Sequence, residues 1–177
     1  IEAHVSALEF EKGAAFCDEI IKENPAWLKD YESVVSSLQA IAYYGLGNED
    51  LGELYLQQFL KSPLTTVARL ATVAGKLRDI DQLEPALALL LDANRRDPGN
   101  EVILSAIIEI ELDLGESRLL SERVNQLLSL RRPTYGLLED IMNEFHSDRF
   151  ILTPGRESML ESLAITIEEK NIDGILF

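Results

Sequence analysis

Apolar residues recur along this chain at the spacing of an α-helix, and turn-forming residues interrupt them at short intervals. The clearest example lies between residues 65 and 100. Its first apolar stripe consists of Leu70, Val73, Ala74 and Leu77, and its second of Leu83, Ala86, Leu87, Leu90 and Ala93. Each stripe follows the i, i+3, i+4, i+7 pattern of one helix face. Residues 79–81 separate the stripes and residues 97–100 end the second, so we expect two helices packed antiparallel.

The same plan recurs on both sides of this segment, and prolines mark its period. The repeating prolines are Pro25, Pro63, Pro98 and Pro133, separated by 38, 35 and 35 residues. Residues 34–60 hold two stripes around a glycine-rich break, and residues 104–128 hold two more around Gly115. Such a period is typical of helical repeats. Because a helix pair cannot bury both of its faces alone, we expect neighbouring pairs to stack.

The predicted fold is therefore all-α, with two parts. Residues 1–146 are predicted to form tandem helix pairs in which the first repeat is truncated, so that residues 10–24 are its second helix. Residues 147–177 depart from the period. They predict a C-terminal capping helix that begins after Thr153-Pro154 and ends near Lys170, followed by a short apolar tail. A terminal helix of this kind covers the last exposed repeat.

The spacing resembles that of the tetratricopeptide repeat family, in which 34 residues form helix A, a turn and helix B. With Pro98 as the closing proline, the family's small positions fall on Ala74, Ala86 and Ala93, and its large positions fall on Leu70, Val73, Leu77, Leu83 and Leu90. The repeat ending at Pro63 matches when shortened by one residue. The repeat ending at Pro133 departs from the pattern, because Glu109 and Leu128 occupy small positions. The resemblance covers residues 1–146 and implies a right-handed α-solenoid of antiparallel helix pairs.

In that family the helix A segments line a concave groove that binds a peptide or a partner helix. Carried onto this sequence, the groove positions are Ser37, Ile41, Tyr44, Ala71, Gly75, Arg78, Ala106, Ile110 and Asp113. The lysines and asparagines that clamp a carboxylate in one subclass are missing, so the resemblance implies an apolar partner segment. Packing against neighbouring helices is the alternative role for these residues. If they line the groove, Tyr44→Ala and Arg78→Glu should weaken partner binding with little effect on stability.

The charge of the chain narrows the range of partners. It carries 16 basic and 31 acidic residues, a net charge of −15. Residues 1–60 and 101–177 each carry a net charge of −8, whereas residues 61–100 carry +1. So acidic a surface repels phosphate backbones, which argues against a nucleic-acid partner. No apolar run approaches the ~20 residues that span a bilayer, so no membrane insertion is expected. The near-neutral centre is either a docking region or an ordinary solvated surface.

Candidate chemistry is sparse. The only histidines are His4 and His146, and Cys17 is the single cysteine, so a metal site lacks ligands and no internal disulfide can form. Cys17 lies among apolar residues and is expected to be buried. The chain has no nucleophile elbow, phosphate-binding loop or dinucleotide fingerprint. We therefore expect neither an enzyme nor a cofactor.

These features together predict a protein–protein interaction scaffold, an adaptor of bacterial type that binds a peptide or helix in its groove. A holding chaperone for secreted or assembling subunits is an alternative. A structural spacer that forms homo-oligomers is another. The chain begins at Ile1 rather than Met, which is consistent with a segment of a longer protein whose targeting signals lie elsewhere. The cytoplasm is the favoured compartment.

Overall fold

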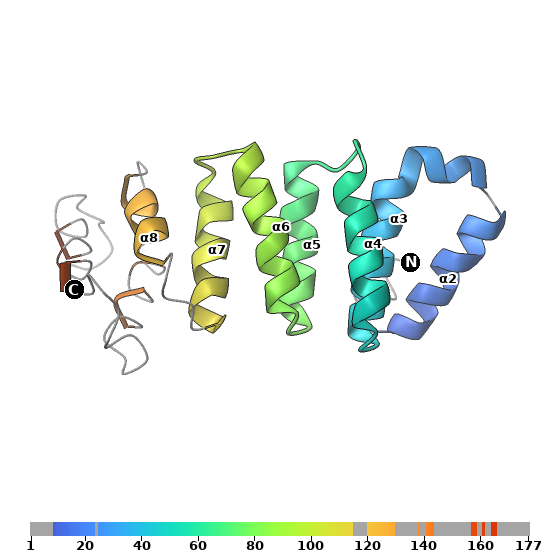
Figure 1. The fold of residues 1–177 in the computed structure, drawn as a ribbon, viewed down its shortest axis with the longest axis horizontal. Coiled ribbons are helices and arrows are strands. Elements are labelled where there is room, and N and C mark those ends of the chain that lie inside the picture. Colours follow the sequence, from blue (N-terminus) through green and yellow to red (C-terminus); the bar gives the residue numbers. More distant parts are fainter. Residues whose placement is uncertain are drawn as a thin grey trace, which may run out of the picture. The chain divides into compact units, whose positions relative to one another are not determined.

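The computed structural model describes residues 9–23, 25–114 and 120–129, together with 138, 141–143, 157–158, 161 and 164–165. All regular secondary structure in these ranges is α-helical, and they contain no strand (Figure 1). The all-α prediction is thus confirmed for the described part of the chain. The chain divides into two compact units, residues 1–93 and 94–177, and each is considered by itself below.

The helices follow one another with short connections. The first unit contains α2 (Phe10–Glu23), α3 (Pro25–Gly45), α4 (Glu49–Lys61), α5 (Val67–Asp79) and the part of α6 (Leu83–Arg96) up to Ala93. The second unit contains α7 (Glu101–Leu114) and α8 (Leu120–Ser129). The predicted breaks at residues 45–48 and 79–81 are present as turns.

Both turns of the first unit end a helix in the same way. After α3, Gly47 adopts φ +71°, its N–H donates to the Tyr44 carbonyl, and the Asn48 N–H donates to the Tyr43 carbonyl. These are the two bonds of a Schellman motif. After α5, Asp81 takes the equivalent position with φ +61°. An aspartate before a helix is often its N-cap, but this backbone conformation makes Asp81 the end of α5 instead.

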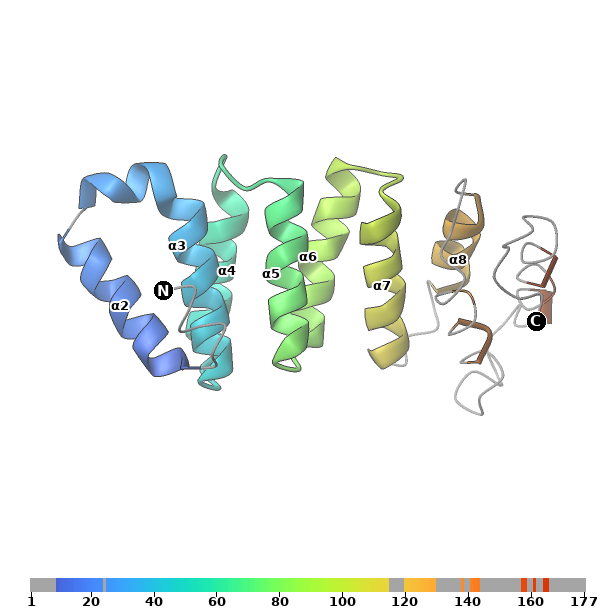
Figure 2. The ribbon, with the colours of Figure 1, turned by 180° about the vertical axis from the view of Figure 1, so that it is seen from behind.

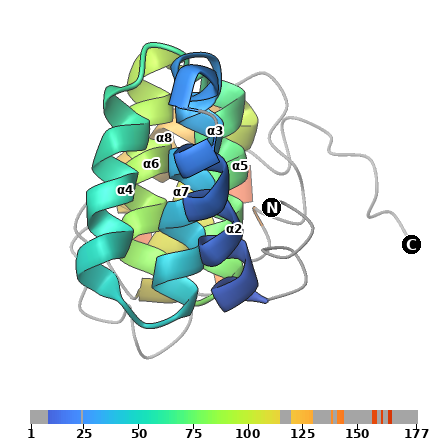
Figure 3. The ribbon, with the colours of Figure 1, turned by 90° about the vertical axis from the view of Figure 1, so that its right-hand side faces the viewer.

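Helix α3 forms the centre of the first unit. It contacts α2, α4 and α5, and Figure 3 shows it between α4 and α5 with α2 in front. Every residue from 33 to 44 is buried except Val34 and Tyr43, which are half-buried. The buried set includes small residues that let helices approach closely, namely Ser33, Ser36, Ser37, Ala40 and Ala42. A helix surrounded in this way needs no polar face.

The first part of α3 runs in a different direction from the rest, as Figures 1 and 2 show. The exposure of its residues changes at the same place, because residues 29–32 are exposed and Ser33 is buried. The Ser36 hydroxyl donates to the Glu32 carbonyl at 2.6 Å. Serine bonds to the carbonyl four residues earlier often bend helices, and this bond lies beside the elbow.

The helices of the first unit form two hairpins. Helices α3 and α4 contact each other across the turn at residues 46–48, so they run antiparallel. Helices α5 and α6 are joined by residues 80–82 and run side by side in opposite directions in Figures 1 and 2. Helix α5 also contacts α3. Two hydroxyl contacts, from Ser33 to Thr65 and from Ser37 to Arg69, both join residues 32 positions apart. Thr65 directly precedes α5 and Arg69 lies in its first turns, so the two contacts follow one another in the same direction along both segments and α3 and α5 run parallel.

In the second unit, α7 packs against α8. The Glu111 side chain is 5% exposed and forms an ion pair with Arg123 of α8, with 3.5 Å between Oε1 and Nε. The pair therefore lies buried between the two helices, although a glutamate is mostly exposed in proteins. Residues 157–158, 161 and 164–165 of the predicted capping helix are helical. Its remaining residues, and the predicted boundary at residues 146–147, lie outside the described ranges.

Candidate functional site

The three predicted groove residues of α3 are buried in the first unit. Ser37, Ile41 and Tyr44 are 0%, 3% and 6% exposed. The Tyr44 ring lies against Gly52 of α4, and its hydroxyl donates to Glu53 at 3.0 Å. These residues hold α3 among its neighbours, which is the packing alternative. The expectation that Tyr44→Ala leaves stability nearly intact is therefore wrong, since truncating a buried aromatic ring costs about 3–5 kcal/mol.

The three predicted residues of α5 lie on its accessible face. Gly75 is exposed, whereas Ala71 and Arg78 are half-buried. A Cβ atom added at Gly75 would meet no other atom within 4 Å, so the surface beside it is open. Thr72 and Ala68, one and two turns earlier, are also exposed. The structure thus brings Ala71, Gly75 and Arg78 together on a surface of small side chains.

The candidates of α7 are divided between its two faces. Ile110 is 1% exposed and belongs to the interior. Asp113 is exposed and Ala106 is half-buried. These residues belong to the second unit, and each unit has its own candidate surface.

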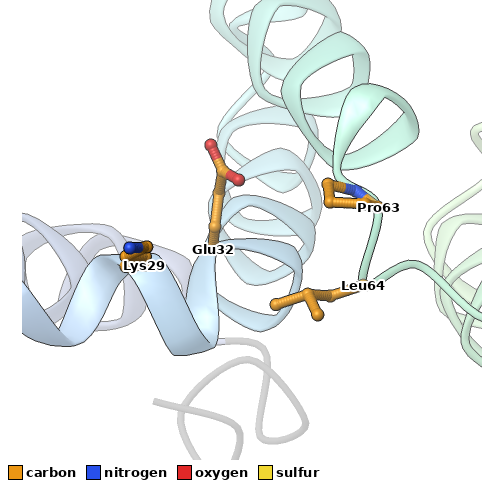
Figure 4. A pocket seen from close by; sticks show the side chains of 4 residues that line it. All are labelled: Lys29, Glu32, Pro63 and Leu64. Atoms are coloured by element: carbon orange, nitrogen blue, oxygen red, sulfur yellow. The ribbon is translucent and has the colours of Figure 1, made fainter.

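The elbow of α3 creates a pocket that the sequence did not indicate. We call it the elbow pocket, and it is lined by Lys29, Glu32, Pro63 and Leu64. It has a volume of about 430 Å³ and is open to solvent. Figure 4 shows the Leu64 side chain pointing toward α3, while the Glu32 carboxylate points away from Leu64. Leu64 is 49% exposed. The Ser-Pro-Leu sequence at residues 62–64 is the only signal in the chain that marks this loop.

A seam of polar side chains continues from the elbow pocket between α3 and α5. The Ser33 and Thr65 hydroxyls lie 2.9 Å apart, and Thr65 donates to the Phe59 carbonyl at 2.5 Å. One turn further along, Arg69 Nη2 donates to the Ser37 hydroxyl at 3.1 Å. Ser33, Ser37 and Thr65 are all at most 5% exposed. The α3–α5 contact therefore includes hydroxyl groups and one cation.

Two tyrosines form a second feature that sequence reasoning missed. The rings of Tyr43 and Tyr55 stack with centroids 5.3 Å apart and an interplanar angle of 12°. Asp18 of α2 accepts a hydrogen bond from Gln39 at 3.0 Å and lies 3.5 Å from the Tyr43 hydroxyl. Burial raises the pKa of both tyrosines, and the negative charge of Asp18 raises it further. This cluster joins α2, α3 and α4 and has the character of a structural contact.

Cys17 is fully buried beside this cluster, as the sequence predicted. Burial raises the pKa of its thiol to about 12, and Asp18 acts in the same direction. A thiol in this state is a poor nucleophile, because thiolate is the reactive form. Cys17 is thus a small packing residue.

Within the described ranges, no group of three or more His, Cys, Asp or Glu side chains is arranged to hold a metal ion. No described helix combines the length and hydropathy of a membrane-spanning segment. Comparison with known proteins found no protein-family model and no curated sequence that matches this chain.

Proposed function

We propose that this chain is a tetratricopeptide-like helical-repeat scaffold that binds a segment of a partner protein. The observation that carries the proposal is the contact of α3 with α5, in which Ser37 meets Arg69. Equivalent helices of consecutive repeats are expected to lie parallel and adjacent, because successive repeats stack in the same orientation. Each of the two helices is also followed by its own antiparallel partner. A right-handed solenoid of such pairs is the architecture that this pattern supports.

The accessible face of α5 is the binding surface we propose for the first unit. Its small side chains at Ala68, Ala71 and Gly75 allow a partner backbone to approach closely, and Arg78 lies at the far end of the same helix. This surface belongs to residues 61–100, which carry a net charge of +1 in a chain of −15. It is therefore the region where the acidic surface repels an incoming acidic partner least.

The proposal can be tested by site-specific photo-crosslinking. A photo-reactive amino acid replaces Gly75, where open space accommodates it without repacking. The matched control places the same amino acid at Gln58, an exposed position on α4. The protein, carried in its natural full-length chain, is irradiated in its own cells. We expect one discrete heteromeric product from position 75 and a much weaker one from position 58.

The other outcomes identify the alternatives. A broad set of unfolded clients, together with suppression of their aggregation, would make the protein a holding chaperone. A product of twice the chain's own mass would make it a homo-oligomeric spacer. Equal products from both positions, or none, would overturn the proposed surface.

A further inference from the structure

Besides joining three helices, the cluster around Asp18 presents an oriented carboxylate to solvent. Asp18 is exposed on α2, Gln39 Nε2 donates to its Oδ1 at 3.0 Å, and the Tyr43 hydroxyl lies 3.5 Å from its Oδ2. Both partners are neutral, and no basic side chain in the described part of the chain pairs with Asp18. Gln39 is only 2% exposed, so a buried amide fixes the direction of the carboxylate. Little ordering then remains to be done when a cation binds.

Two stacked aromatic rings lie beside this carboxylate. Tyr43 and Tyr55 are half-buried, their ring centroids are 5.3 Å apart and their planes differ by 12°. The contact between Asp18 and Tyr43 is exposed to solvent, so a side chain from outside can reach the carboxylate and the Tyr43 ring together. The face of an aromatic ring is negative and attracts cations.

The electrostatic surroundings of the cluster have one sign. Burial and then the charge of Asp18 raise the pKa of Tyr43 and of Tyr55, and no basic side chain of the described residues lowers it. Residues 1–60, which contain the whole cluster, carry a net charge of −8. The potential at the cluster therefore favours a positively charged ligand and disfavours an acidic one.

We propose that Asp18, Tyr43 and Tyr55, which we call the Asp18 cluster, bind an arginine side chain of a partner protein. The guanidinium stacks on the accessible part of the Tyr43 ring and donates to the Asp18 carboxylate. A guanidinium suits both contacts, because it is planar and its N–H groups form a fork, whereas a lysine ammonium is a compact, strongly hydrated charge. The Asp18 cluster lies on α2, α3 and α4 and not on the α5 face, so this inference goes beyond the proposed function.

The test is an NMR titration of the whole 177-residue chain, labelled with ¹⁵N and with ¹³C in its tyrosine rings. The probes are capped Gly/Ser peptides with one central arginine, lysine or citrulline, since citrulline keeps the planar shape of arginine without its charge. We expect saturable shifts of the Gln39 side-chain amide and the Tyr43 ring with the arginine peptide. Its affinity should exceed that of the citrulline peptide by about tenfold, and that of the lysine peptide severalfold.

Substitutions assign the contacts. Asp18→Asn keeps the size of the side chain and removes its charge, so the arginine peptide should bind no more tightly than the citrulline peptide. Tyr43→Phe keeps the ring and should retain binding, whereas Tyr43→Leu removes the ring and should abolish the preference for arginine over lysine. The matched control is Glu19→Gln, which removes a neighbouring exposed carboxylate of α2 and should leave the preference for arginine intact.

The comparison of peptides is made on the natural chain, so it does not depend on whether a variant folds. Equal binding of the arginine and citrulline peptides, tighter binding of the lysine peptide, shifts confined to other residues, or no saturable binding would each overturn the inference. An equal loss of preference with Glu19→Gln and with Asp18→Asn would also overturn it, because a diffuse acidic surface would then explain the binding. None of these results changes the crosslink expected at position 75, so the scaffold function stands or falls separately.

Discussion

Gly52 and Gly75 both lie inside helices of the first unit, but their surroundings are opposite. A Cβ atom at Gly52 would lie 2.7 Å from the Tyr44 ring, whereas one at Gly75 would meet nothing within 4 Å. We predict that Gly52→Ala lowers the free energy of unfolding by about 1–3 kcal/mol through overpacking. Gly75→Ala should raise it by about 0.5–1 kcal/mol, because alanine restricts the unfolded chain more than glycine does.

Urea unfolding of both variants checks this pair, with the slope of the transition unchanged. The same chemical change in the same kind of element gives opposite signs, so helix propensity alone cannot explain the result. If Gly52→Ala were as stable as the natural chain, the close contact between α3 and α4 would be wrong.

Because the Cys17 thiol is buried, we predict that the free energy of unfolding falls at alkaline pH. Its folded pKa is about 12, whereas a free thiol ionises near pH 9. Between these values the folded chain keeps a proton that the unfolded chain has lost, so the free energy of unfolding falls as pH rises. The fall should be about 1.4 kcal/mol per pH unit. Below pH 9 the thiol contributes no pH dependence.

The control for this prediction is Cys17→Ala, measured by urea unfolding between pH 8 and 11. The variant should lose the decline between pH 9 and 10. It should keep the decline above pH 10, where Tyr43, Tyr44 and Tyr55 ionise more readily in the unfolded chain. An unchanged slope between pH 9 and 10 would show that the thiol is not buried.

Individual residues also mark the limit of prediction from the sequence. The apolar stripe of α5, which includes Leu70 and Leu77, is buried as predicted, because its period alone defines the inward face. Tyr44 was assigned to a groove and is instead buried, whereas its neighbour Tyr43 is the half-buried one. A rotation of about 100° per residue separates the two. A family position shifted by one residue is enough to exchange their roles.

At the scale of elements, helix α3 differs most from the sequence expectation. The glycine-rich break predicted its end, whereas its beginning at Pro25 lies nine residues before the first apolar position of the predicted stripe, Val34. The elbow was not predictable, because the bond from the Ser36 hydroxyl to the Glu32 carbonyl beside it leaves no trace in the apolar pattern. The elbow pocket shares this origin. Its walls come from two segments that are distant in sequence, and no local pattern records their proximity.

The burial of α3 predicts which of its backbone amides exchange most slowly with solvent. Amides from Leu38 to Ala42 should exchange with solvent at least about tenfold more slowly than those from Lys29 to Glu32, a difference of about 1.4 kcal/mol in opening free energy. The reason is that residues 33–44 are covered by three helices, whereas residues 29–32 are exposed. Native-state hydrogen exchange followed by NMR measures both groups in one sample. Equal protection along α3 would contradict the central position of its second part.

At the scale of the whole molecule, the periodicity of the sequence predicted more than its motifs did. The all-α class follows from apolar periodicity and from the spacing of the prolines, and the described helices agree with it. The surroundings of Arg69 could not be derived from the sequence, since they depend on how α5 packs against α3. Arg69 is an ordinary surface arginine in the sequence. Only its contact with Ser37 and its unpaired Nε distinguish it.

The net charge of −15 predicts a stabilising effect of salt. Self-repulsion of like charges opposes the compact state, and raising the ionic strength from about 0.01 to 0.15 M shortens the screening length from about 30 to 8 Å. The ion pair between Glu111 and Arg123 is buried and is screened little, and exposed pairs such as Lys12 with Glu9 contribute little. Repulsion should therefore dominate, and Tm should rise with salt by about 2–4 °C for each 1 kcal/mol gained in the free energy of unfolding.

Calorimetry at pH 7 with increasing NaCl measures the change in Tm. The control repeats the measurement near the isoelectric point of 4.5, because the net charge vanishes there. A Tm that falls with salt at pH 7 would mean that attractive pairs, rather than the acidic excess, govern the stability of the chain.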